Sequence, residues 1–354
     1  NEGVFGPRLQ QADIEVYCLH MKGLGVLTGC LALRRLLKRL QPDVVQTWMY
    51  HADLLGGLVA RSVGLKHIAW GIRNSGENLH HSSWEARVLA SVSAKLSGYI
   101  PSRIVACAEN AARRHKQWGY SANKMVVIPN GYNLQQWQPQ AEQARQFREQ
   151  LGLDSNTVLI ATVGRWNPLK DHPNLLAALA RLKRSEPEWF CVLVGEGMDE
   201  TNADLMTLLT QHGLQDRVAL LGRRDDVPII MSAADIHVLS SKAEGFPNVV
   251  CEAMVSRALC VVTDVGDAAR IVADDGSVVA PRNAQALAAG IEKAFVVLQG
   301  PELQQTLDKA AERIAKRYSL ETMVQNYQQL WGGMVQKNTE RLAGTSLSKP
   351  VPLL

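Results

Sequence analysis

The chain has 354 residues and a formal net charge of +4, because 38 Lys and Arg stand against 34 Asp and Glu. Apolar residues make up 46% and charged residues 20%, a balance typical of a soluble globular protein with a sizeable core. These values exclude a disordered chain, a collagen-like fibre and a small disulfide scaffold, and the length predicts two or three domains.

Two further classes of protein are disfavoured. No basic tract is present, so we expect no nucleic-acid partner. The most apolar stretches, Asp53–Leu65 and Val249–Val262, both contain charged residues and fall short of the roughly 20 apolar residues that a membrane span needs. The six cysteines are scattered without a CxxC pair, which favours reduced thiols in a cytoplasmic protein.

In the first part of the chain, short β-branched segments alternate with helical patterns, which predicts a parallel sheet covered by helices. The expected strands are Asp43–Thr47, His67–Trp70, Arg103–Ala106 and Met125–Ile128. The expected helices are Leu31–Leu40 and Ala52–Val63.

The pattern breaks at Ile128-Pro129-Asn130-Gly131, where Pro and Asn-Gly favour a turn. We interpret the polar stretch Gln135–Gln150 as the connection to a second domain. The strands expected there are Thr157–Val163, Trp189–Val194, Val218–Leu221, Ile236–Leu239, Leu259–Thr263 and Gly276–Val279. The helices expected there are Asn174–Arg184, Ala203–Gly213 and one that follows Pro247.

The predicted organisation is therefore two Rossmann-like domains, residues 1–135 and 136–318. A terminal helix over 319–336, capped by Ser319, is expected to pack back on the first domain, before a flexible tail over 337–354. Neither domain opens with GxGxxG, which weakens an NAD-binding interpretation.

The densest group of chemically capable residues is the stretch 241–254. Gly245-Phe246-Pro247 follows a predicted strand and opens a helix, and free backbone N–H groups at such a helix start attract anions. Glu252 falls on the apolar helix 249–255, where an unpaired carboxylate is costly and a ribose hydroxyl pair would satisfy it. The alternative is that Glu252 pairs with a neighbouring Arg and that Glu244 is a solvated loop residue.

A second group, 163–173, follows another predicted strand end, where open α/β sheets bind ligands. Arg165 and Lys170 lie five residues apart in one loop and could clamp a diphosphate. Ordinary surface charge on a turn is the alternative interpretation.

Together the two groups resemble the GT4-type retaining glycosyltransferases (glycosyltransferase group 1), which have the GT-B fold. The residues that carry the resemblance are Gly164, Arg165 and Lys170, then Glu244-Gly245-Phe246 with Glu252 eight positions on. Supporting landmarks are 128–131, 194–197, 221–223 and 263–266. The resemblance implies an α/β structure, two Rossmann-like domains whose parallel sheets face a central cleft.

The resemblance also implies a role for each matching position. Gly164, Arg165 and Lys170 would bind the donor pyrophosphate, Glu252 would hold the ribose, and Glu244 would lie near the donor sugar. The amides at Gly245, Phe246 and Asn248 would contact sugar and phosphate, while Gly195, Glu196 and Arg223 would border the base. The reaction would retain the anomeric configuration without a metal or other cofactor, and the absence of Asp-x-Asp agrees with this.

The first domain departs from the family pattern in two ways. The glycine-rich loop that usually follows the first strand is absent, and the chain begins at Asn1. We expect that about 40 residues are missing before Asn1, and divergence of this part of the domain is the alternative. In place of a frequent His, the chain has Arg73 and Asn74. We take Glu244 and Arg73 as the catalytic candidates, and His51, Asn74 and His80 as acceptor-side candidates.

The predicted function is transfer of a sugar from a UDP- or GDP-linked donor to a glycan or lipid-linked saccharide. The basic helix around Arg34–Arg39 could touch an anionic membrane, which would place the protein at the inner face of the membrane, although a solvated helix face is the alternative. The competing functions are a nucleotide-sugar epimerase, a phosphorylase-type enzyme with a lysine-bound pyridoxal group, and a non-catalytic nucleotide-sugar-binding subunit.

Overall fold

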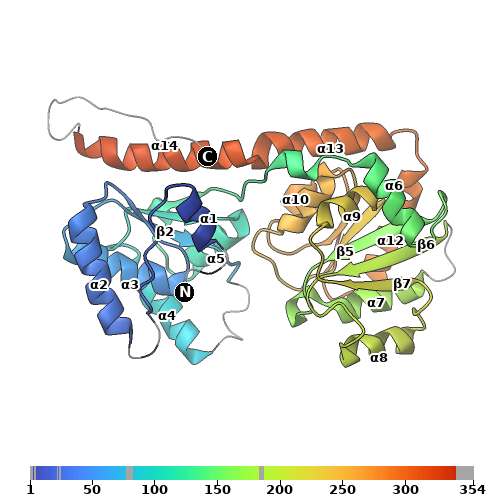
Figure 1. Ribbon diagram of the computed structural model, residues 1–354, viewed down its shortest axis with the longest axis horizontal. Coiled ribbons are helices and arrows are strands. Elements are labelled where there is room, and N and C mark those ends of the chain that lie inside the picture. Colours follow the sequence, from blue (N-terminus) through green and yellow to red (C-terminus); the bar gives the residue numbers. More distant parts are fainter. Residues whose placement is uncertain are drawn as a thin grey trace.

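Two parallel β-sheets lie side by side, each covered by helices (Figure 1). The computed structural model describes residues 3, 5–21, 23, 25–76, 83–182 and 187–339. The first sheet has the order β1-β2-β3-β4, with β1 (Val45–Gln46), β2 (Ile68–Ile72), β3 (Arg103–Ala106) and β4 (Met125–Val127). The second has the order β10-β9-β8-β5-β6-β7, with β5 (Val158–Val163), β6 (Trp189–Val194), β7 (Val218–Gly222), β8 (Ile236–Leu239), β9 (Leu259–Thr263) and β10 (Ser277–Val279). The α/β, GT-B arrangement expected from the sequence is thus present.

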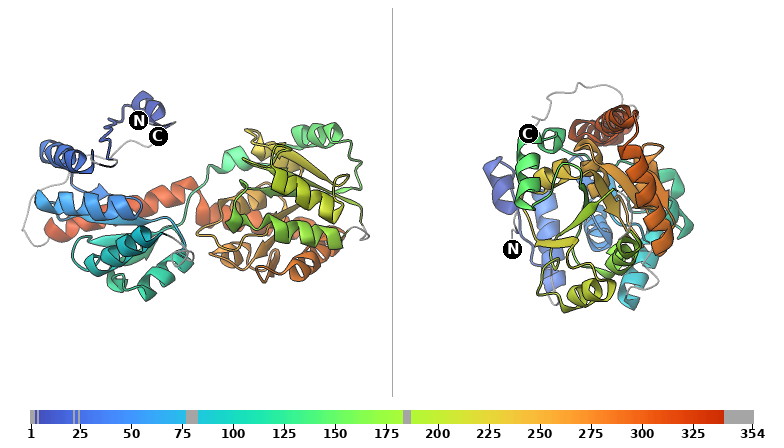
Figure 2. Two further views of the ribbon diagram at one scale, coloured as in Figure 1. Left: turned by 90° about the horizontal axis from the view of Figure 1, so that it is seen from below. Right: turned by 90° about the vertical axis from the view of Figure 1, so that its right-hand side faces the viewer.

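The helices form layers on the faces of the sheets. Those of the first domain are α1 (Gly6–Gln11), α2 (Gly25–Leu40), α3 (Tyr50–Ser62), α4 (Trp84–Leu96) and α5 (Glu109–Gln117). Those that follow are α6 (Ala141–Gln150), α7 (His172–Arg181), α8 (Ala203–His212), α9 (Val227–Ala233), α10 (Asn248–Val255), α11 (Ala268–Val272), α12 (Ala284–Leu298), α13 (Leu303–Tyr318) and α14 (Leu320–Thr339). In the second domain, α7, α8 and α12 pack on one face of the sheet, and α6 and α9 pack on the other (Figures 1 and 2).

Local sequence explains most of these elements. All five residues of β2 are buried, as an apolar run in a parallel sheet requires. Several helices begin where a polar side chain accepts a first-turn N–H: Ser83 caps α4, Asn202 caps α8 and Asn283 caps α12. The expected cap at Ser319 is confirmed, because its Oγ accepts the backbone N–H of Thr322 at 3.1 Å.

Two expectations need correction. The strand expected over 43–47 is limited to Val45–Gln46. The N–H groups of Thr47 and Met49 still donate to the Ala69 and Gly71 carbonyls of β2, and the positive φ of Met49 then turns the chain into α3. The polar stretch 135–150 is not only a connection, since 141–150 forms α6. The buried Phe147 of this otherwise polar helix packs among apolar residues of the second sheet and α9, and Arg148 pairs with Asp235 at 2.9 Å.

The chain crosses between the domains at two adjacent points. The Tyr132 N–H donates to the Tyr318 carbonyl at 3.0 Å, and the Leu320 N–H donates to the Tyr132 carbonyl at 2.9 Å. Gly131 makes this approach feasible, because a Cβ there would lie 2.7 Å from the Ser319 carbonyl oxygen. Beyond the crossing, α14 follows α13 end to end along both domains and packs through Tyr327 against the first sheet (Figure 1).

The flexible tail expected over 337–354 overlaps the end of α14, which continues to Thr339, and residues 340–354 lie outside the described part of the chain. Within the described part, none of the helices combines the length and the apolar character that crossing a membrane requires.

Candidate functional site

The site lies where the strand order of the second sheet reverses. Strands β5 and β8 are neighbours, and the chain continues from β5 to β6 on one side and from β8 to β9 on the other. The loops that leave their carboxyl ends are 164–171 and 240–247, the two segments singled out from the sequence. Open α/β sheets form their ligand crevice at such a reversal, because the loops on either side turn away from each other.

Lys170 and Glu244 meet at the centre of this reversal. The Lys170 ammonium donates to Glu244 Oε1 at 2.7 Å, and the Ser241 hydroxyl donates to the same oxygen at 2.7 Å. The Lys170 and Glu244 side chains are 25% and 14% exposed, so the pair is partly shielded from water. Glu244 is therefore not a solvated loop residue, and the alternative interpretation of this position was wrong.

Glycines allow backbone segments of the site to approach each other closely. Gly195 has a φ of +145°, and a Cβ there would lie 2.3 Å from the Gly164 carbonyl oxygen. The two loops are joined directly, since the Trp166 N–H donates to the Glu196 carbonyl at 2.7 Å. A Cβ at Gly164 would lie 3.5 Å from the Lys170 side chain, which is ordinary van der Waals contact. A side chain at Gly195 would therefore push the Arg165–Lys170 loop away from the sheet.

The start of α10 presents the features of an anion site. The backbone N–H groups of Gly245, Phe246 and Asn248 form no hydrogen bond with any described residue. The Phe246 ring packs against Tyr132 and Tyr318 and so anchors the loop in the core. The backbone of the loop then forms the surface of the site. The Phe246 side chain therefore fixes the loop, while the three backbone N–H groups can bind an anionic ligand.

Glu252 lies one turn into the same helix and is only partly exposed. Burial raises the pKa of its carboxyl to about 7. Among the described residues it has neither an ion pair nor a hydrogen bond from its carboxylate, so the alternative of a neighbouring Arg partner is not what the structure contains.

Residues of both domains line one cavity of about 410 Å³. The lining residues are Tyr50, Arg73, Asn74, Ser75, Gly76 and Ala86 from the first domain, and Leu169, Ala243, Glu244 and Gly245 from the second. The Gly245 backbone lies directly against the first domain, where a Cβ would sit 3.4 Å from the Ser75 nitrogen. Four predicted site residues, Arg73, Asn74, Glu244 and Gly245, thus share this space.

A buried polar chain holds Asn74 on the first-domain wall. The Tyr50 hydroxyl hydrogen-bonds to Asn74 Oδ1 at 2.9 Å and to His115 Nε2 at 2.6 Å. The other ring nitrogen of His115 lies 2.7 Å from the Ala111 carbonyl oxygen within α5. Burial lowers the pKa of His115 to about 4 and raises the pKa of Tyr50 to about 12, so both groups are neutral at pH 7.

Arg73 belongs to a second polar chain that bridges the domains. Its guanidinium donates to Asn130 Oδ1, and Asn130 Nδ2 donates to Asn248 Oδ1 at 2.8 Å. The Tyr132 hydroxyl donates to the same Asn248 oxygen at 2.7 Å. Asn248, predicted as a donor-binding residue through its amide, is thereby fixed through its side chain as well.

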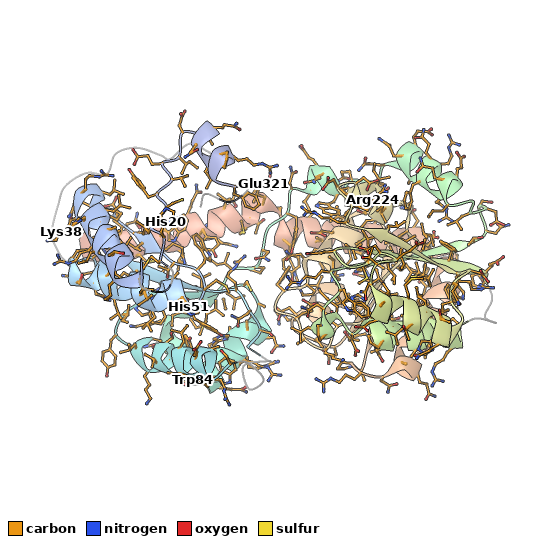
Figure 3. The ribbon with its side chains drawn as sticks, turned by 60° about the horizontal axis from the view of Figure 1, so that its bottom comes forward. His20, Lys38, His51, Trp84, Arg224 and Glu321 are labelled. Atoms are coloured by element: carbon orange, nitrogen blue, oxygen red, sulfur yellow. The ribbon has the colours of Figure 1, made fainter. Side chains whose placement is uncertain are left out.

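The remaining predicted site residues that the structure describes do not line this cavity. The side chains of Arg165, Glu196 and Arg223 are exposed and have no partner among the described residues. His51 is exposed at the start of α3 and does not line the cavity (Figure 3). His80 lies outside the described residues.

Sequence reasoning missed Tyr50 and His115 as supports of Asn74, and Ser241 as a partner of Glu244. Tyr50 is 65 residues from His115, and no local pattern signals that pairing. Within the described ranges, no three His, Cys, Asp or Glu side chains are grouped as metal ligands.

Comparison with known proteins places this geometry in a family. The model of glycosyl transferases group 1 matches residues 143–314, and the model of Glycosyltransferase Family 4 matches residues 4–136. The chain belongs to the GT4-type, group 1 glycosyltransferase family. The group 1 match contains both loops of the site, and the Family 4 match contains Arg73 and Asn74.

Curated members of this family resemble the chain at moderate identity. An Escherichia coli UDP-Gal:α-D-GlcNAc-diphosphoundecaprenol α-1,3-galactosyltransferase is 28% identical over 264 residues, which is 71% of this chain and 65% of that protein. A Campylobacter jejuni N,N'-diacetylbacillosaminyl-diphospho-undecaprenol α-1,3-N-acetylgalactosaminyltransferase is 26% identical over 88% of this chain and 82% of its own length. The first of these matches spans slightly less than two thirds of its relative.

Solved structures agree on the fold. The Anabaena protein HepE in complex with UDP superposes with a TM-score of 0.82 at 22% identity, over 94% of this chain and 90% of that one. Its complex with UDP-glucose gives a TM-score of 0.80 at 23% identity, over 94% and 89% of the two chains. At these identities the likeness shows the GT-B fold of the family.

Proposed function

We propose that this protein transfers a sugar from a UDP- or GDP-linked donor to a glycan or lipid-linked saccharide, with retention of configuration and without a metal. The observation that carries the proposal is the Lys170–Glu244 pair at the strand-order reversal, because Glu244 lines one cavity together with Arg73 and Asn74. Relatives named for transfer to diphosphoundecaprenol-linked sugars support the acceptor class.

Each part of the site then has a chemical task. Lys170 and Arg165 neutralise the negative charge of the donor diphosphate, and the free N–H groups at the start of α10 donate hydrogen bonds to its oxygens. Glu252, which has no protein partner among the described residues, accepts the ribose hydroxyls. Because Glu252 is shielded from water by burial, hydrogen bonds from two ribose hydroxyls would be stronger than the same bonds in water.

Retention of the anomeric configuration fixes which bonds break and form. The bond between the anomeric carbon and the diphosphate oxygen breaks, and the acceptor oxygen bonds to that carbon on the same face. The acceptor proton passes to the departing diphosphate. Arg73 and Asn74 line the opposite wall, where they orient the acceptor, and Glu244, held by Lys170 and Ser241, lies beside the sugar.

The proposal is tested with the whole chain, a panel of UDP- and GDP-sugars, and a diphosphate-linked saccharide acceptor. The expected result is acceptor-dependent nucleotide release, a product whose anomeric configuration matches the donor by NMR, and activity that survives a chelator. Conversion of the donor without acceptor would indicate an epimerase, and an inverted product would overturn the retaining mechanism. Nucleotide binding without transfer to any acceptor would favour a non-catalytic subunit.

Contact with an anionic membrane is part of the same proposal. One face of α2 carries the exposed Leu27 and Leu31, at 78% and 55% exposure, followed by exposed Arg34, Arg35 and Lys38. Lys38 lies at the end of the first domain remote from the second (Figure 3). We expect the chain to sediment with phosphatidylglycerol vesicles and not with phosphatidylcholine vesicles. Replacing Arg34 and Arg35 by Glu should abolish this, and unchanged sedimentation would contradict the contact.

A further inference from the structure

Helix α5 of the first domain is capped by a residue of the second. Its own preceding residue, Ala108, offers no side-chain acceptor. Instead, the Asp267 carboxylate accepts the N–H of Glu109 and the N–H of Asn110, one at each oxygen and both at 2.8 Å. The Asn110 side chain adds a bond to the Gly266 carbonyl at 3.2 Å. A buried carboxylate at a helix start also interacts favourably with the helix dipole.

On the second-domain side, Asp267 is joined to the 240–247 loop that carries Glu244, called the donor loop below. Gly266 has a φ of +56°, and a Cβ there would lie 2.5 Å from the carbonyl oxygens of both Glu244 and Gly245. The Asp267 N–H also donates to the Gly245 carbonyl at 3.3 Å. The 266–267 segment therefore supports the loop that carries Glu244, and a shift of one moves the other.

On the first-domain side, α5 supports the opposite wall of the cavity. His115, fully buried one and a half turns along α5, holds the Tyr50 hydroxyl, which in turn holds Asn74. A continuous series of close contacts thus runs from Glu244 through Asp267 and α5 to Asn74. Both ends of this series line the same cavity.

We propose that Asp267 is a positioning residue, which sets the separation between the donor loop and the acceptor wall. Its two bonds replace an ordinary N-cap by one that forms only when the domains approach, so closure of the cleft and completion of α5 occur together. The inference rests on the proposed function, because it assigns Asp267 to the same reaction. Asp267 itself does not line the cavity and does not touch the reacting atoms.

The test compares Asp267→Ala and Asp267→Asn with the control Asp274→Asn, which changes an exposed carboxylate of the same domain. We expect transfer kcat/KM to fall about 30-fold in Asp267→Ala and about tenfold in Asp267→Asn, because Asn retains one of the two acceptors. The affinity for UDP, measured by calorimetry, should change less than twofold, since the proposed nucleotide contacts lie in the second domain. A loss of fold would weaken both quantities.

A second readout does not depend on activity. Hydrogen exchange of the Glu109 and Asn110 amides should accelerate at least tenfold in Asp267→Ala and remain unchanged in Asp274→Asn. Wild-type turnover together with unchanged exchange in Asp267→Ala would overturn the inference. If the wild-type chain transfers no sugar while the exchange still responds to Asp267, the proposed function fails and the positioning role for that reaction fails with it. If Asp267→Ala does not fold, the isosteric Asp267→Asn and Asn110→Ala, which removes the third cross-domain bond, decide the same question.

Discussion

The Lys170 ammonium and the Glu244 carboxylate lie 2.7 Å apart although 74 residues separate them in the chain. They meet because β5 and β8 are neighbours in the sheet and their loops leave the same edge. Removal of either partner would leave a partly buried charge against a wall of the cavity, so this pair is the most direct target for mutation.

Replacing Lys170 by Ala should lower transfer turnover at least 100-fold, because the donor diphosphate and Glu244 both lose their cation. The free energy of unfolding should fall by only about 1–2 kcal/mol, since the pair is partly exposed and solvent screens the remaining charge. Steady-state kinetics and denaturant unfolding measure the two effects. Lys316→Ala, which removes an exposed lysine of α13, is the matched control. Turnover within threefold of wild type in Lys170→Ala would contradict the assignment.

Nucleotide binding should become tighter as the pH rises through about 7. The pKa of Glu252 is raised to about 7 by burial, and the ribose hydroxyls need the ionised carboxylate as their acceptor. We expect the Kd for UDP to fall about tenfold between pH 6 and 8, a drop that Glu252→Gln lacks. Calorimetry in two buffers should also detect release of a proton on binding in wild type only. An identical pH profile in the two proteins would refute the role.

Glu252 should also lower the stability of the ligand-free protein at high pH. The folded state holds the carboxyl proton up to about pH 7, whereas the unfolded chain releases it near 4.5, so stability from this group falls as the pH rises between those values. At pH 8, Glu252→Gln should therefore be more stable than wild type by up to about 3 kcal/mol, at about 1.4 kcal/mol per pH unit. At pH 4 the two should be equal. Denaturant unfolding at both pH values checks this, and equal stability at pH 8 would be inconsistent with it.

Gly195→Ala should displace the Arg165–Lys170 loop, because its Cβ would lie 2.3 Å from the Gly164 carbonyl oxygen. We expect a loss of about 3 kcal/mol or more in unfolding free energy, or a 100-fold loss of UDP affinity if the loop moves instead. Gly152→Ala is the control, because Gly152 also has a positive φ but open space around it, and it should cost only about 1 kcal/mol. Equal behaviour of the two variants in unfolding and in calorimetry would contradict the close approach.

Much of the fold could be predicted from short patterns. The strands 103–106 and 189–194 have the expected limits, because apolar β-branched runs between turn residues signal buried parallel strands. The pattern failed at 141–150, since a helix with only two buried side chains, Ala144 and Phe147, resembles a polar connection. It also set the limits of the first strand too wide at 43–47, where only Val45–Gln46 is strand and the positive φ of Met49 turns the chain into α3.

The amino-acid sequence was enough to single out the segments 164–170 and 244–252. The first carries two cations directly after a strand, and the second combines two carboxylates with free amides at the start of a helix. Their pairing became visible only in the folded chain: Lys170 with Glu244, Tyr50 with both Asn74 and His115, and Asp267 with the start of α5. The physical reason is distance along the chain. Local patterns report the conformation of neighbouring residues, whereas these partners lie from 24 to 158 positions apart and meet only through strand order and the approach of two domains.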